Sequence, residues 1–592
     1  MKQRINLIHA GICENKLFVA LEGTVYDCNH LVKPRVLLWF ENGKEDRNFS
    51  LRITDVQYDS NGVCRFKGGF YCSLNCIFWS TKKQNLPFKL HFDVICGDER
   101  KERVDFYANP RDFVLRRNDY DLELCGRTEL AFHPLQLETT GNGPIKKLRK
   151  SAVHVLLAVA TLISIPWGLI ELMASAGDCV PFEKKRRFVY EKKSEGVPFN
   201  RSDKIFVLYN NSLRRIKKGL IRMGYAVLAR LPKRNQSVSF ISQRSDQLEG
   251  NFKFVYDELK KHPQIKLRFF LNLRTIERMT YLDIFRFCKA CAFSQVVLVD
   301  EYVPSMYTIK LRKPTKLIQL WHACGAFKTF GFSRIGMPGA PTQASPAHRN
   351  YDYVTVSSSN IRIWYAQGFG LPMKAIVPTG VPRTDMFSDP QYVEQVRKQF
   401  YEKYPQLKTK KILLFAPTFR GNGKETAYYP MEKFQPEKIY EQTGREYAIL
   451  IKQHPFVPDR IEIPDQYKDV ILDMSDFPEI NDLLFVSDLV ITDYSSLIFE
   501  ASLLELPMLF YVYDLEEYTN ERDFYFDFGP TIPGKKVFSQ SELIKAINES
   551  DFEQEKVKGF SEKYFDDHDG KSTERVTKLI LNLVQGKNYE KN

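Results

Sequence analysis

The sequence contains few cysteines and no recognisable export signal. Its 592 residues include only 11 cysteines, an odd number spread thinly along the chain. Small secreted domains depend on dense, paired cysteines, so this pattern favours a reducing compartment. The opening MKQRINLIHAG is interrupted by Glu14 and Lys16 before an apolar stretch of signal-peptide length can form. We therefore expect a chain that stays on the cytoplasmic side and is not exported by that route.

Several motifs of nucleotide and metal chemistry are also missing. The glycine-containing run Gly421–Lys424 lacks the spacing of a Walker phosphate loop, and no G-x-G-x-x-G motif follows a strand-like run. Cys288 and Cys291 have no second cysteine pair nearby, so a zinc site is not expected. The acidic clusters around Asp121 and Asp567 are interpreted as solvated turns. The sequence therefore predicts no cofactor and no metal site.

The excess positive charge is confined to one segment. Lys and Arg exceed Asp and Glu by 14 in the whole chain, and residues 140–235 alone hold 20 basic against 6 acidic residues. This segment contains the longest apolar run, Ala152–Ala176, with basic clusters on both sides. His154, Pro166 and Glu171 disfavour a simple membrane span. A helical hairpin that dips into one leaflet fits these features better.

A second stretch of the same segment, Ser212–Lys233, has the pattern of a basic amphipathic helix on a membrane surface. The alternative is a buried helical hairpin that joins two domains and has solvated basic faces. Nucleic acid is a weaker candidate partner, because no aromatic and basic stacking motif accompanies the charge. We predict that residues 140–235 associate with an anionic membrane surface and that the chain has no nucleic-acid partner.

The remaining chain divides by its hydrophobic patterns. Residues 1–115 contain short alternating runs separated by turn clusters, which predicts a small all-β, sandwich-like domain. From residue 236, short apolar strands alternate with helical stretches, the pattern of doubly wound α/β domains. We place a first Rossmann-like domain at 236–385 and a second at 386–592, with a terminal helix. Strands are predicted at Val238–Ser242, Arg268–Leu271, Val296–Val299, Leu317–Leu320, Tyr353–Val356, Ile412–Phe415, Ile449–Ile451, Leu489–Ile491 and Met508–Tyr513.

Histidine and basic side chains follow several of these strands. His322 comes directly after Leu317–Leu320, at the strand end where α/β folds bind ligands. The near-neutral pKa of a histidine suits a general base that acts on a hydroxyl. Arg420 follows a second strand, and Lys452 and His454 follow a third. A single such histidine is more often structural, but the repeated placement favours a phosphate-binding site.

Two serines lie where a strand turns into a helix. Ser495 and Ser496 follow the strand Leu489–Ile491, and Glu500 comes one helical turn later. Free backbone N–H groups and two hydroxyls at such a turn make a cradle for a phosphate or pyrophosphate. An ordinary helix N-cap explains the same residues equally well.

Taken in order along the chain, six motifs together resemble the CDP-glycerol glycerophosphotransferase family of teichoic acid polymerases. The resemblance covers about Val238 to the C-terminus, and the β-rich N-terminal part is similar to the extra domain of some polyol-phosphate polymerases. It implies a GT-B-like α/β fold with the active site in the cleft, held peripherally or monotopically on the cytoplasmic face of the cell membrane. The motifs are Trp321-His322, Gly380-Val381-Pro382-Arg383, Ala416-Pro417-Thr418-Phe419-Arg420, Lys452-Gln453-His454-Pro455, Ile491-Thr492-Asp493-Tyr494-Ser495-Ser496 and Phe524-Tyr525-Phe526-Asp527.

The resemblance also implies roles for individual residues. His322 matches the candidate catalytic base, and His454 matches the histidine that meets the donor pyrophosphate. Arg420 and Lys452 lie in the same motifs and are predicted to contact substrate. The positions that match CDP-polyol binding are Arg383, Pro417, Thr418, Ser495, Ser496 and Glu500. The chain reads Trp-His-Ala-Cys-Gly where Trp-His-Gly-Thr-Pro is commoner, and Glu500 stands in place of Asp, which leaves both glycerol and ribitol open as the polyol.

The activity implied is transfer of glycerol-phosphate or ribitol-phosphate from a CDP-polyol to a lipid-linked acceptor of teichoic-acid type, with release of CMP. The alternatives are a GT-B glycosyltransferase that uses a nucleotide sugar and a non-enzymatic scaffold on the membrane. The Asp-Tyr-Ser-Ser motif disfavours the first alternative, and the two histidines disfavour the second. A homo-oligomer is compatible with this assignment.

Overall fold

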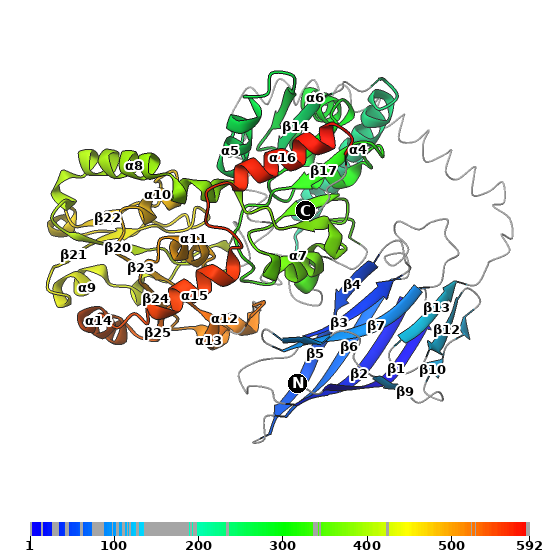
Figure 1. Cartoon of the computed structure of the whole chain (residues 1–592), viewed down its shortest axis with the longest axis horizontal. Helices are drawn as coiled ribbons and strands as arrows, with labels where there is room; N and C mark the ends of the chain where they lie inside the picture. Colours follow the sequence, from blue (N-terminus) through cyan, green and yellow to red (C-terminus); the bar gives the residue numbers. More distant parts are fainter. Residues whose placement is uncertain are drawn as a thin grey trace.

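The computed structural model describes most of residues 198–587, the strands of the N-terminal region, and Val189 and Lys192. The gaps after residue 198 are short and lie at 233–235, 335–340, 342–344, 422–425, 522–523 and 527. The predicted membrane run Ala152–Ala176 lies outside the described residues. Two α/β domains lie side by side, and the N-terminal sheets lie next to the first of them (Figure 1).

The N-terminal strands form two sheets. One has the order β10-β1-β2-β6-β5, with β9 also paired to β1, and the other has the order β11-β12-β13-β7-β3-β4, with β8 paired to β7. Leu37, Trp39 and Ile95 of the second sheet pack against the first α/β domain. The strands are β1 (Gln3–Cys13), β2 (Lys16–Val25), β3 (Arg35–Glu41), β4 (Asp46–Ser50), β5 (Arg52–Tyr58), β6 (Cys64–Ser73), β7 (Phe88–Cys96), β8 (Glu99–Lys101), β9 (Phe106–Ala108), β10 (Phe113–Val114), β11 (Arg116–Arg117), β12 (Tyr120–Cys125) and β13 (Glu129–Pro134).

The first α/β domain contains a parallel sheet of six strands in the order β15-β14-β16-β17-β18-β19. The strands are continuous apolar runs, such as the fully buried Val296–Val299, because both faces of a parallel sheet are covered. The elements are β14 (Ser237–Ser242), α5 (Gly250–Leu259), β15 (Lys266–Leu271), α6 (Tyr281–Ala292), β16 (Val296–Val299), β17 (Lys316–Gln319), β18 (Tyr353–Thr355), α7 (Arg362–Phe369) and β19 (Ile376–Val377).

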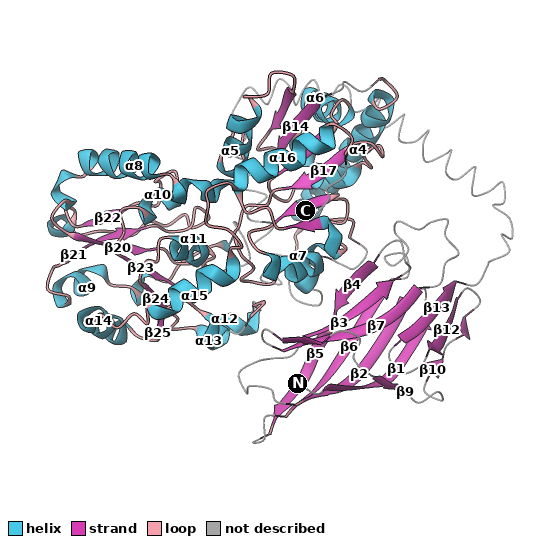
Figure 2. Cartoon of the chain, in the orientation of Figure 1, coloured by secondary structure: helices cyan, strands magenta, loops and turns pink. Residues whose placement is uncertain are grey.

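The second α/β domain repeats the plan with the strand order β22-β21-β20-β23-β24-β25, and helices lie on both sides of its parallel sheet (Figure 2). Its strands are β20 (Lys411–Phe415), β21 (Tyr447–Ile451), β22 (Ile471–Asp473), β23 (Leu489–Thr492), β24 (Met508–Tyr511) and β25 (Lys535–Val537). Its helices are α8 (Pro390–Lys403), α9 (Pro436–Gln442), α10 (Ile480–Leu484), α11 (Leu497–Leu503), α12 (Leu515–Glu521), α13 (Phe528–Thr531), α14 (Gln540–Glu549) and α15 (Glu555–Tyr564).

The predicted interfacial helix is the second half of a longer helix, α4 (Arg201–Leu228), and one of its faces is buried. Asn200 and Asp203 form a capping box at its start. Ile221 and Tyr225 join the core of the first α/β domain, and the Lys217 ammonium donates to the Glu277 carbonyl (2.6 Å). Residues of the basic segment therefore belong to the first domain, whose predicted start at residue 236 was too late. In the described part of the chain, no helix is both long and apolar enough to cross a membrane.

The chain finally crosses back to the first domain. α16 (Ser572–Val584), which the predicted boundaries group with the second domain, packs on the first sheet (Figure 1). Its residues Val576, Leu579 and Ile580 share a core cluster with Val238 and Phe240 of β14. An apolar helix face is visible in the sequence, but the sheet that it covers is not.

Candidate active site

A strained turn presents His322 at the carboxyl edge of the first sheet. Trp321, the residue before it, has a left-handed backbone (φ 58°), and its N–H donates to the Gln319 side-chain oxygen (2.8 Å). Gly325 is also left-handed (φ 63°), and a Cβ there would lie 2.2 Å from the Phe499 ring. Left-handed non-glycine residues are uncommon and gather at functional sites. The Trp-His-Ala-Cys-Gly segment therefore makes two sharp turns that project His322 from the strand end.

The His322 ring is uncharged at neutral pH. Its side chain is open to solvent, but protein atoms surround it at longer range, and this burial lowers its pKa. The positive charges of Arg244 and Arg383 lower the pKa further, to about 3. A hydrogen bond to the Asp300 backbone carbonyl acts in the opposite direction and raises the pKa. A neutral imidazole has a lone pair that can accept a proton, but a pKa this low makes His322 a weaker base than the near-neutral histidine expected from the sequence.

In the second domain, Asp493 ties the ends of β20 and β23 together. Its Oδ1 accepts the N–H groups of Thr418 (2.8 Å) and Tyr494 (2.6 Å), and its Oδ2 accepts from Arg420 (2.9 Å). Both oxygens of the Asp493 carboxylate therefore accept hydrogen bonds from within the protein. This bracing places the Ala-Pro-Thr-Phe-Arg segment beside the turn that carries the two serines.

Three hydroxyls of this region remain available to a ligand. The Thr418 Oγ1 is buried and has no hydrogen-bond partner among the described residues. Ser495 and Ser496 are half-buried, and the Ser495 hydroxyl accepts only a long bond from the Leu497 N–H (3.3 Å). The helix that follows, α11, has seven residues. The groups available for the predicted phosphate site are therefore these hydroxyls, and not the N-terminus of a long helix.

Two of the predicted substrate contacts are occupied by protein partners. Arg420 binds Asp493 and both carboxylate oxygens of Asp514 (2.6 and 3.0 Å) within a cage of tyrosine rings. Burial opposes its charge, but the two carboxylates outweigh burial and raise its pKa. Lys452 donates to the carbonyls of Ser475 (2.7 Å) and Phe477 (2.6 Å). Both side chains stabilise the loops of the site, and their contact with substrate stays a prediction.

His454 follows β21 and is uncharged for the same reasons as His322. Burial, Lys328 and Arg244 lower its pKa to about 4. Its Nδ1 accepts the Phe456 N–H (3.1 Å), which places the proton of the neutral ring on Nε2. The rings of Phe419 and Phe456 both contact the His454 ring and also contact one another. His454 therefore presents an N–H donor to a ligand.

Arg383 and Glu500 join the two domains through a buried ion pair. Arg383 lies in the 3-10 helix Pro382–Ser388 of the first domain, and Glu500 lies on α11 of the second. Cys324 contacts both side chains, and burial and Glu500 raise the pKa of its thiol. Cys324 and Glu500 are two of the four positions at which the chain departs from the commoner motifs, and these two residues contact one another. Glu500 thus binds Arg383 before any polyol arrives.

Asn251, which lies in none of the six motifs, links two parts of this site. Its side-chain nitrogen donates to the Trp321 carbonyl (2.7 Å), and its oxygen accepts the Arg383 N–H (3.0 Å). The residue is fully buried on α5. A buried amide with two backbone partners fixes the relative position of the His322 turn and the Arg383 segment.

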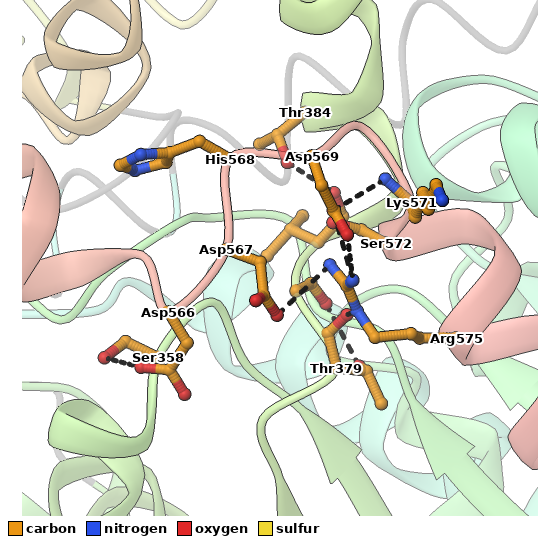
Figure 3. Close-up of polar contacts among 12 residues, drawn as sticks. Ser358, Thr379, Thr384, Asp566, Asp567, His568, Asp569, Lys571, Ser572 and Arg575 are labelled. Atoms are coloured by element: carbon orange, nitrogen blue, oxygen red, sulfur yellow. Dashed lines mark hydrogen bonds and ion pairs between the residues drawn. The ribbon is translucent and has the colours of Figure 1, made fainter.

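The acidic cluster after α15 holds the crossover to α16 in place. Asp566 accepts the Ser358 hydroxyl (2.8 Å), and Asp567 and Asp569 pair with Arg575 of α16 (Figure 3). Among the residues that the structure describes, no group of three His, Cys, Asp or Glu could hold a metal ion. The carboxylates of this cluster therefore connect α15 and α16 to the first domain.

Comparison with known proteins assigns the chain to a family. Residues 223–582 match the family described as CDP-Glycerol:Poly(glycerophosphate) glycerophosphotransferase. The chain belongs to this family. The resemblance drawn from the six motifs is thereby confirmed. The family match spans both α/β domains and includes His322, His454 and the two serines.

Individual relatives and solved structures agree with this assignment. The chain is 43% identical over 373 residues to the teichoic acid poly(ribitol-phosphate) polymerase of Bacillus spizizenii, an alignment that covers 63% of this chain and 60% of that protein. It is 39% identical to the teichoic acid ribitol-phosphate primase of the same species, with coverage of 63% and 98%. A structure of the wall teichoic acid polymerase TagF has a TM-score of 0.53 at 17% identity, and covers 69% of this chain and 99% of that chain. The paired parallel-sheet domains of the predicted fold are confirmed.

Proposed function

We propose that the protein transfers polyol-phosphate units from a CDP-polyol to a lipid-linked acceptor of teichoic-acid type and releases CMP. The proposal rests above all on one observation: the family match includes two histidines, His322 and His454, that follow parallel strands and whose pKa values are lowered by burial and by the charge of Arg244. CDP-ribitol is the preferred donor of the proposal, because the relatives at 39–43% identity are named for ribitol-phosphate. The N-terminal sheets would serve as an accessory domain.

The proposed reaction is a direct displacement at phosphorus. His322 takes the proton of an acceptor hydroxyl, the hydroxyl oxygen bonds to the β-phosphorus of the CDP-polyol, and the bond from that phosphorus to CMP breaks. His454 donates its Nε2–H to the phosphate oxygens. The hydroxyls of Thr418, Ser495 and Ser496 add further donors where negative charge develops. The ion pair between Arg383 and Glu500 fixes the position of the two domains relative to each other.

The proposal is tested by offering the purified full chain CDP-ribitol or CDP-glycerol with a lipid-linked primer. We expect CMP release and a mass increase of the primer by one or more polyol-phosphate units. A nucleotide sugar serves as the competing donor. Sugar transfer without polyol-phosphate transfer would contradict the proposal and favour the glycosyltransferase alternative.

Catalysis is expected to be independent of divalent metal. The phosphate contacts of the proposal are hydroxyls and an imidazole N–H, and the nearby acidic cluster is paired with Arg575 and Ser358. Excess EDTA should leave the rate of CMP release unchanged. A complete loss of rate that magnesium restores would contradict this expectation, and Asp566, Asp567 and Asp569 would become the candidate ligands.

We also propose that the protein is attached to the cytoplasmic face of the cell membrane. α4 leaves Met223 and Val227 exposed (58% and 54%) on the face opposite its buried side, next to Arg222 and Arg230. Apolar side chains among basic ones are the pattern of an interfacial helix on anionic lipid. Residues 140–188, which hold the predicted apolar hairpin, would add to this contact.

Binding of the full chain to anionic vesicles should weaken as salt rises, because basic residues supply part of the attraction. The double variant Met223→Asp, Val227→Asp should weaken binding further. The matched control is Gln395→Asp, Gln399→Asp, which places two acids at the same spacing on exposed positions of α8. If the unmodified chain ignores anionic vesicles at low salt, the attachment proposal is wrong.

A further inference from the structure

The first sheet has a polar cluster at its topological switch point. Its strand order reverses direction between β14 and β16, and α/β folds bind ligands at the carboxyl ends of the strands beside such a reversal. Arg244 follows β14, and Asp300 and Glu301 follow β16 directly. In the second sheet the reversal lies between β20 and β23, which lead to Thr418 and Ser495. The proposed donor contacts occupy the second switch point, so the first one remains to be assigned.

The geometry of this cluster leaves polar atoms available to a ligand. The Arg244 guanidinium lies 3.7 Å from the Glu301 carboxylate, longer than a charge-assisted hydrogen bond, and its side chain is 58% exposed. The Asp300 Oδ1 is buried and has no hydrogen-bond partner among the described residues. Such an atom is costly unless a ligand or water binds it.

One side chain fixes the cluster against the His322 turn. Gln319 donates to the Glu301 carbonyl (2.9 Å) and accepts the Trp321 N–H (2.8 Å). His322 itself bonds to the Asp300 backbone carbonyl. The two carboxyl groups are therefore held next to the histidine that the proposed mechanism uses as the base.

The charges suit an acceptor that carries both hydroxyls and a phosphodiester. Burial raises the pKa of both Asp300 and Glu301 to about 7, so near neutral pH the two carboxyls include protonated and ionised forms. A hydroxyl both donates and accepts hydrogen bonds. A protonated carboxyl can donate a hydrogen bond to it, and an ionised carboxyl can accept one from it. The planar guanidinium of Arg244 matches a phosphodiester anion.

We propose that Arg244, Asp300 and Glu301 form the acceptor subsite. Asp300 and Glu301 bind hydroxyls of the terminal polyol unit, and Arg244 binds the phosphodiester that joins this unit to the rest of the acceptor. The ligand class is the free end of a polyol-phosphate chain. The inference rests on the proposed function, since it names the second substrate of the same site.

The test measures the binding of each substrate separately and needs no turnover. The full chain is titrated calorimetrically with a short ribitol-phosphate oligomer and, separately, with CDP-ribitol. Arg244→Ala and Glu301→Gln should each weaken oligomer binding about 10- to 100-fold, the usual range for a lost hydrogen bond to a charged group, and should change CDP-ribitol affinity far less. Arg244→Lys, which keeps the charge without the planar fork, should recover part of the affinity.

The matched controls are Lys261→Ala and Glu258→Gln, a more exposed ion pair on and just after α5 in the same domain. They should change neither affinity. Unchanged oligomer binding in Arg244→Ala and Glu301→Gln would overturn the inference, as would an equal loss of CDP-ribitol binding. CMP release by the unmodified chain reports on the proposed function independently, so the two failures are distinguishable.

Discussion

His322→Ala should reduce CMP release by about 10²- to 10⁴-fold, the usual contribution of a general base, while the affinity for the CDP-polyol stays close to that of the unmodified chain. The ring is uncharged in the free protein because burial, Arg244 and Arg383 lower its pKa to about 3. It therefore contributes little to the binding of an anionic donor. Its contribution arises when the acceptor hydroxyl loses its proton, which occurs only in the transition state.

Two measurements separate binding from turnover in this variant. Calorimetric titration with CDP-ribitol gives the donor affinity, and a CMP-release assay at saturating donor gives the rate. The control is His262→Ala, a histidine between α5 and β15 at the opposite edge of the first sheet. Near-normal turnover of His322→Ala would show that the base assignment is wrong and that the Trp321–His322 turn has a packing role.

The strands of the α/β domains were predictable because each is a short apolar run bounded by polar residues. All nine predicted runs are strands, and no end differs from the prediction by more than two residues. The three strands that the pattern missed are β19, β22 and β25, which have two or three residues. β22 and β25 carry partly polar sequence, as in Ile471–Asp473, because they lie at the edges of the second sheet.

The approximate position of the site was also predictable, since strand ends meet at one edge of a parallel sheet. The same rule applied to Val296–Val299 would have found Asp300 and Glu301, which follow that strand directly. The role of Asn251 was not predictable in this way. It lies inside α5 and reaches Trp321 and Arg383 through contacts that only the folded chain brings together.

Two residues that were predicted to contact substrate, Arg420 and Lys452, instead have polar partners within the protein. Arg420 and Lys452 stand in the right motifs, but each is buried next to acceptors of its own chain. A buried cation needs such partners before any ligand binds. The sequence identifies a basic residue near a strand end, but it does not show whether Asp514 or a substrate phosphate will pair with it.

His454→Ala should weaken both donor binding and turnover, in contrast to His322→Ala. The Phe456 N–H occupies Nδ1, so the neutral ring offers its Nε2–H to the donor pyrophosphate. Loss of a single donor of this kind typically costs about 2–4 kcal/mol of transition-state stabilisation. Part of that cost should appear in the ground state, because the pyrophosphate is already anionic when the donor binds.

The conservative variant His454→Gln tests the geometry of this contact. A glutamine side chain can place an amide N–H donor near the position of the ring Nε2, so it should recover part of the donor affinity that His454→Ala loses. Titration of both variants with CDP-ribitol, beside the CMP-release assay, gives the two free-energy changes. If His454→Ala lowers turnover by about 10²-fold without any change in donor affinity, His454 acts only in the transition state, and its assignment as a ground-state pyrophosphate contact is wrong. His454 would then no longer differ from His322, because both histidines would stabilise only the transition state and neither would contribute to donor binding.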